Sequence, residues 1–82
     1  MKNVTYNTEG TCSKQIQFVL ADDGTIDKVE FLGGCHGNLQ GIAALVKGRR
    51  PEEVIATLKG IRCRDKATSC PDQLARALEQ AM

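Results

Sequence analysis

Four cysteines in a chain of 82 residues are the side chains with the clearest capacity for chemistry. Each lies beside a turn former, a charge cluster or an expected helix start; they are Cys12, Cys35, Cys63 and Cys70. Cysteines that serve only as apolar filler tend to lie inside hydrophobic runs, whereas turns and helix starts are where ligands and reactive thiols are presented. Four thiolates at one point would suit a tetrahedral Zn²⁺ site or an iron–sulfur cluster, because soft sulfur favours these metals.

The residues around two of these cysteines favour the deprotonated thiolate. Cys70 lies next to Pro71 at an expected helix start, where the helix dipole is positive. Cys63 lies between Arg62 and Arg64. No C-x₂-C pair occurs, so the spacing of a standard zinc finger is absent and only the fold can unite the four thiols. Redox-active thiols without a metal, and four unrelated thiols, are the other interpretations that the residues leave open.

Other residues near the cysteines also have alternative interpretations. His36 could be a metal ligand, a base for a neighbouring thiol, or simply a surface or capping histidine. Asp72 could be a general acid or base, although an acidic residue in a first helical turn is commonly only a helix-start feature. Residues 33–37 lack the Gly-Lys-Ser/Thr ending of a phosphate loop, so the case for nucleotide binding there is weak. Arg49 and Arg50 are interpreted as the solvated end of a helix–helix turn.

Hydrophobic periodicity predicts three strands followed by three helices. Strands are expected at residues 3–6, 14–21 and 26–32, with a hairpin turn from Asp22 to Gly24. Helices are expected from Asn38 to a stop at Gly48, from Pro51 to a stop at Gly60, and from Pro71 to the C-terminus. This order predicts an α+β fold, a three-stranded antiparallel sheet with three helices packed on one face. Helices folded back on the sheet would bring the four cysteine-bearing loops to one end.

Length and composition bound the class of protein. The chain should form one domain, residues 1–82, with a core so small that a metal, disulfides or a partner subunit would add needed stability. The N-terminal segment has no apolar leader, so we expect a cytoplasmic protein in which thiols stay reduced. No stretch is apolar enough to span a membrane. The net charge of +1 and the scarcity of aromatic residues disfavour nucleic-acid binding.

The segment from Ala67 to Asp72 contains the letters Thr-Ser-Cys-Pro-Asp, the string that names the TSCPD domain family. This string, the segment from Gly33 to Asn38 and the four-cysteine layout resemble that family over essentially the whole chain. The resemblance implies a small stand-alone protein of bacterial type, related to domains at the C-terminus of ribonucleotide reductases, notably cobalamin-dependent ones. It also implies that the cysteines are candidate zinc ligands.

A more distant resemblance concerns the fold. Several segments, including those around three of the cysteines, are similar to iron–sulfur cluster scaffold proteins related to the N-terminal part of NifU, which share the order of three strands and three helices. The scaffold's three cysteines would fall on Cys12, Cys35 and Cys70. Its two other ligands would fall on Lys14 and Ser69, which differ from the scaffold residues, and Cys63 is additional. An all-cysteine set should hold its metal more tightly, which favours a retained metal over cluster handover.

These observations together predict a four-cysteine accessory domain that binds zinc or an iron–sulfur cluster through Cys12, Cys35, Cys63 and Cys70. By family resemblance, its setting would be ribonucleotide reduction, with a reductase or another protein as partner. The alternatives are a thiol relay from Cys63 and Cys70 to a ribonucleoside-diphosphate reductase, or an iron–sulfur scaffold or carrier. A chain of 82 residues cannot house a radical-generating barrel, so a reductase label would refer to association or homology.

Overall fold

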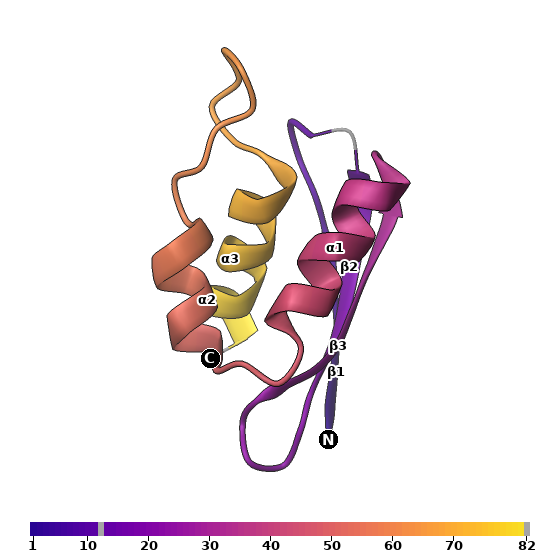
Figure 1. Cartoon of the computed structure of the whole chain (residues 1–82), viewed down its shortest axis with the longest axis vertical. Helices are drawn as coiled ribbons and strands as arrows, with labels where there is room; N and C mark the ends of the chain where they lie inside the picture. The colour runs from indigo at the N-terminus through magenta and orange to yellow at the C-terminus, as the bar shows by residue number, and fades with distance from the viewer. Residues whose placement is uncertain (12, 82) are drawn as a thin grey trace.

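The computed structural model describes residues 1–11 and 13–81. Three strands are followed by three helices (Figure 1). The strands are β1 (Lys2–Asn7), β2 (Ser13–Leu20) and β3 (Ile26–Gly33), and the helices are α1 (His36–Val46), α2 (Pro51–Leu58) and α3 (Cys70–Ala81). The predicted α+β class and the predicted order of elements are confirmed.

The sheet is antiparallel with the order β1-β2-β3. The predicted hairpin turn is present, with Gly24 in the left-handed region at φ +90°. At the far end of β2, Ser13 pairs with Gly33 and Gln15 with Leu32, so Lys14 is an extra residue in the ladder. Such a bulge shifts the alternation of side chains by one position. It turns Ser13 towards the helical side of the sheet, where this serine is buried.

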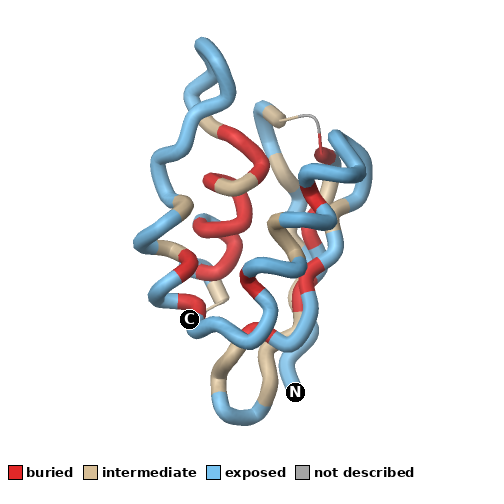
Figure 2. The backbone as a smooth tube through the Cα atoms, viewed as in Figure 1, coloured by how far each residue is buried: buried red, intermediate tan, exposed pale blue. Residues whose placement is uncertain are grey.

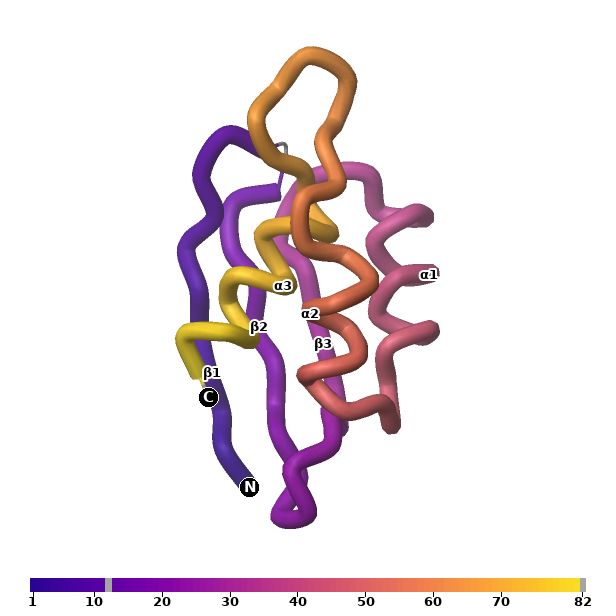
Figure 3. The backbone as a smooth tube through the Cα atoms, turned by 90° about the vertical axis from the view of Figure 1, so that its left-hand side faces the viewer, coloured from indigo at the N-terminus to yellow at the C-terminus, as the bar shows by residue number. Residues whose placement is uncertain are grey.

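The three helices lie on one face of the sheet, as predicted (Figures 1 and 3). α1 packs along β3, α3 lies over β2, and α2 packs mainly against α3. The opposite face of the sheet carries exposed polar residues, among them Thr5, Gln17, Lys28 and Glu30. The helices therefore bury one side of the sheet and leave the other side to solvent.

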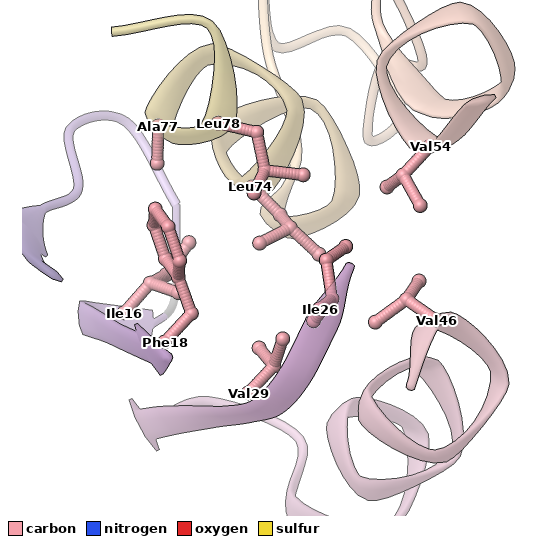
Figure 4. Packing of buried hydrophobic residues seen from close by; sticks show 9 residues of the cluster. All are labelled: Ile16, Phe18, Ile26, Val29, Val46, Val54, Leu74, Ala77 and Leu78. Carbon is pink, nitrogen blue, oxygen red and sulfur yellow. The ribbon is translucent and has the colours of Figure 1, made fainter. Parts of the chain in front are cut away.

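The core fills the space between the sheet and the helices (Figure 4). Its buried members are Ile16, Phe18, Ile26, Val29, Val46, Val54, Leu74, Ala77 and Leu78. The predicted alternation in β2 is confirmed, since Ile16 and Phe18 are both almost completely buried. α3 is the most deeply buried helix, whereas the loop before it is exposed over most of its length (Figure 2).

Two helix starts differ from the prediction. α1 begins at His36, so Asn38 is inside the helix and Cys35, whose backbone is extended, takes the N-cap position. α3 begins at Cys70 rather than at Pro71. The predicted stop after α1 is present, because Gly48 adopts a left-handed φ of +82°.

The two ends of the described chain are tied together. The Lys2 ammonium group donates a hydrogen bond of 2.8 Å to the carbonyl oxygen of Ala81. Both ends lie towards the β2–β3 hairpin, away from the loop that precedes α3 (Figures 1 and 3). Among the helices that the structure describes, none has the length and apolar character needed to cross a membrane.

Candidate functional site

The loop segments that carry the cysteines lie at one end of the molecule (Figures 1 and 3). They are residues 8–11 before β2, 33–36 between β3 and α1, and 59–70 leading into α3, and we call this region the cysteine end. Ser13 links its parts, because it pairs with Gly33 across the sheet and its hydroxyl oxygen lies 3.2 Å from the Cys70 sulfur. The order of elements therefore correctly predicted that these loops share one end of the domain.

The three described cysteines differ in exposure. Cys70 is buried as the first residue of α3, while Cys35 and Cys63 are exposed. Cys12, the fourth predicted ligand, lies outside the described residues. Within residues 1–11 and 13–81, no three His, Cys, Asp or Glu side chains form a group that could hold a metal ion. Cys35, Cys63 and Cys70 thus share one end of the fold without being assembled around a single point.

Cys35 and Cys70 both lie at helix starts. Cys35 is the N-cap residue of α1, and Cys70 is the first residue of α3. A cysteine set offers only soft sulfur donors, which are the donors that Zn²⁺ and iron–sulfur clusters take. The donor chemistry of the cysteine set therefore fits such a metal, while Cys35 and Cys63 are exposed and Cys70 is buried.

Ser69 determines where α3 starts. Its hydroxyl oxygen accepts a hydrogen bond of 3.1 Å from the backbone N–H of Asp72, which makes Ser69 the N-cap. The same hydroxyl donates to the carbonyl oxygen of Ile61 at 2.6 Å. This cap moves Cys70 and Pro71 to the first and second helical positions. The start predicted at Pro71 is one residue late because the signal lies in Ser69: Ser-x-x-Asp before an apolar stripe is close to the spacing of a capping box.

Replacing Ser69 by alanine is expected to lower the free energy of unfolding by about 1–2 kcal/mol, because the cap and the bond to Ile61 are both lost. Urea unfolding followed by circular dichroism measures this change. Thr57→Ala is the matched control, since the Thr57 hydroxyl donates to the Glu53 carbonyl oxygen on the exposed surface of α2, and its expected loss is below about 0.5 kcal/mol. Equal losses in the two variants would contradict the role given to Ser69.

Asp72 is completely buried and surrounded by hydrogen-bond donors of its own chain. Its carboxylate accepts from the backbone N–H of Gly60 at 2.7 Å, from the Thr68 hydroxyl, and from Arg76 Nε at 2.8 Å. Burial acts to raise the pKa of Asp72, but the bonds from Thr68, Gly60 and Arg76 outweigh it and hold the pKa below its usual value. Of the two interpretations of Asp72, this environment favours the structural one over general acid–base chemistry.

The family model of the TSCPD domain matches residues 2–82. The chain belongs to the TSCPD domain family. No curated protein and no solved structure matches it. The family resemblance noted from the Thr-Ser-Cys-Pro-Asp string is thereby confirmed along nearly the whole chain.

In this TSCPD domain, the residues of that string fasten the loop that carries Cys63. Asp72 binds the loop at both ends, at Gly60 and at Thr68. The backbone N–H of Cys63 donates to the Thr68 carbonyl oxygen at 3.1 Å, which folds the loop back on itself. Together with the bond from Ser69 to Ile61, these contacts hold the loop against the start of α3. The Thr-Ser-Cys-Pro-Asp string therefore holds the loop that carries one candidate ligand, Cys63, next to the helix start that carries another, Cys70.

The polar residues around the TSCPD cysteines lie on the surface. His36 is exposed at the start of α1, and its Nε2 lies 2.9 Å from Gln40 Nε2, one helical turn away. This contact matches a surface histidine. Arg62, Arg64 and Lys66 are exposed around Cys63, so the tip of the loop is positively charged. The predicted solvent exposure of the Arg-Arg pair after α1 is also present.

Proposed function

We propose that this TSCPD domain is a four-cysteine metal-binding accessory domain that holds Zn²⁺ or an iron–sulfur cluster. Its ligands would be Cys12, Cys35, Cys63 and Cys70. The observation that carries the proposal is the shared location of the loops at the cysteine end, with Ser13, which follows Cys12 in the sequence, 3.2 Å from the Cys70 sulfur. When bound, the metal would supply a cross-link between these loops, which a domain with so small a core needs.

Several residues of the chain would assist ligation. The Ser13 hydroxyl lies 3.2 Å from the Cys70 sulfur and could donate a hydrogen bond to it in a metal-bound set. The exposed cations Arg62, Arg64 and Lys66 would offset the negative charge that several bound thiolates bring together.

A retained metal fits the surroundings better than a cluster in transit. If the distant resemblance to cluster scaffold proteins holds, Ser69 and Lys14 would stand where a scaffold has its two other ligands. The Ser69 hydroxyl is engaged by the Ile61 carbonyl oxygen and the Asp72 N–H, and Lys14 is an exposed bulge residue. Neither is arranged as a metal ligand, so the proposal assigns the domain a structural or regulatory metal. By family resemblance the proposed partner is a ribonucleotide reductase.

One observation favours a thiol relay as a second candidate. The loop folds back at Cys63, so an exposed thiol and the buried thiol of Cys70 belong to one hydrogen-bonded unit. In a relay, the two thiols would form one disulfide and pass two electrons and two protons to an oxidised thiol pair of the reductase, which would become a dithiol. This candidate requires a reversible disulfide and no stoichiometric metal.

Metal content and absorption of anaerobically purified protein distinguish the two candidates. The metal proposal predicts about one Zn²⁺ per chain without colour, or iron and sulfide with visible absorption. Replacing any one of the four cysteines by serine should lower the metal content, whereas His36→Ala should leave it unchanged. A folded, metal-free protein in reductant would contradict the proposal, and a reversible disulfide between Cys63 and Cys70 in that protein would support the relay.

A further inference from the structure

A groove of about 330 Å³ runs between α1 and α2 on the surface of the domain. The residues that matter here are Ile42, Leu45 and Arg49 on the α1 side, and Glu53, Thr57 and Leu58 on the α2 side. Below the groove, Val46 and Val54 belong to the core and face each other across the gap between the two helices (Figure 4). The groove is therefore an opening over the hydrophobic core, with mostly apolar walls.

Leu45 makes this face unusually apolar. Its side chain is 70% exposed, and it lines the groove. A single exposed leucine needs no explanation, but one that lines an apolar groove over the core is typical of an association surface.

The groove lining includes one positive and one negative side chain, Arg49 and Glu53. α1 and α2 run in opposite directions and are joined by a short turn, so Arg49 just after α1 and Glu53 in the first turn of α2 lie at the same end of the groove (Figure 3). Arg49 Nε donates to the Leu45 carbonyl oxygen at 3.0 Å, which lays the guanidinium group against the last turn of α1. In the part of the chain that the structure describes, neither Arg49 nor Glu53 belongs to an ion pair.

We propose that this face is an interface between two copies of the chain, related by a two-fold axis that runs along the groove. A rotation of 180° about that axis places α1 of one copy opposite α2 of the other at the same height. Arg49 of each copy then faces Glu53 of its partner, and both ion pairs form by symmetry. One turn further along, Leu45 of each copy faces the partner's groove at the level of Thr57. The surface thus matches itself in charge, which an interface with a different protein would not require.

The size of the face sets the expected strength of the dimer. α1 has 11 residues and α2 has 8, so the helices are only about 16 and 12 Å long. Two such helices per copy place the interface at the small end of specific protein contacts. We therefore expect a dissociation constant on the order of 10–100 µM, and a mixture of monomer and dimer at those concentrations.

Sedimentation velocity between about 5 and 500 µM chain, in reductant to prevent intermolecular disulfides, tests the interface. The wild type should shift from monomer to dimer over this range. Leu45→Asp should weaken association at least tenfold, because each copy would bury an unpaired charge. Leu32→Asp is the matched control, since Leu32 is 58% exposed outside the groove, and it should leave association unchanged. Unfolding curves on the same samples check that both variants are folded.

A charge exchange supplies the second arm of the test. Arg49→Glu and Glu53→Arg should each weaken the dimer, because like charges then face each other, and the double variant should restore it by exchanging the partners. A wild type that stays monomeric at 500 µM would overturn the proposal. So would a dimer that Leu45→Asp leaves intact, or a double variant as weak as the single ones. None of these results depends on metal binding, so the interface and the proposed metal site stand or fall separately.

Discussion

Replacing Asp72 by asparagine is expected to lower the free energy of unfolding by about 2–3 kcal/mol. The change removes a buried charge whose three donors, from Gly60, Thr68 and Arg76, remain in place. Breaking a buried ion pair costs roughly 3–5 kcal/mol. The Arg76 side chain is 49% exposed. Solvent therefore screens the ion pair, and the expected loss for Asp72→Asn is about 2–3 kcal/mol rather than the full cost for a buried pair. Urea unfolding of protein with equal metal content measures it.

Glu79→Gln is the matched control for this prediction. It removes the second ion pair that the described part of α3 makes, in which Lys59 Nζ lies 2.8 Å from Glu79 and the two side chains are 50% and 38% exposed. Exposed pairs of this kind contribute at most about 0.5–1 kcal/mol. A loss at Asp72 no larger than the loss at Glu79 would show that the carboxylate does not hold the loop before α3.

The same carboxylate should give the stability of the domain a characteristic dependence on pH. The pKa of Asp72 is lower in the fold than its ordinary value of about 3.9 in an unfolded chain. Its stabilising contribution is therefore complete above about pH 4 and is lost as the pH falls through the lowered value. Below pH 4, the wild type should lose stability faster than Asp72→Asn. A parallel loss of stability in the two proteins below pH 4 would contradict the prediction.

Removal of the proposed metal is expected to have the second large effect. With free Zn²⁺ at about 1,000 times its dissociation constant, binding to the folded state alone contributes about 4 kcal/mol. A chelator should remove that stabilisation, and Cys70→Ser should remove most of it even with Zn²⁺ present. Denaturant unfolding with and without chelator measures both. His36→Ala is the control, and a chelator response equal in wild type and Cys70→Ser would contradict the ligand role.

Much of the fold follows from local patterns in the sequence. The alternation around Ile16 and Phe18, the glycine after the paired aspartates, and the proline that opens α2 each predict an element that is present. These signals are strong because each depends only on local geometry. Alternation follows from the pleat of a strand, glycine accepts the left-handed φ of a turn, and proline has the fixed φ of a helix start. The location of the loops of the cysteine end could also be predicted from the sequence, because it depends only on the order of the strands and helices.

The contacts that build the cysteine end were less predictable. A bulge at Lys14 turns Ser13 inward, and no local pattern announces an extra residue in a ladder. The partners of Asp72 at Gly60 and Thr68 become neighbours only when the loop folds back on α3. The cap by Ser69, in contrast, was readable from the sequence. Side-chain roles that rest on distant partners could not be predicted from local patterns, whereas the Ser69 cap, although missed, has a local signal in the Ser-x-x-Asp spacing.

The hydrogen bond between Lys2 and Ala81 has a consequence for attachment to larger proteins. It holds Lys2 and Ala81 side by side, on the far side of the body from the loops of the cysteine end. A fusion through either terminus would therefore leave those loops facing away from the attached protein and accessible to another molecule.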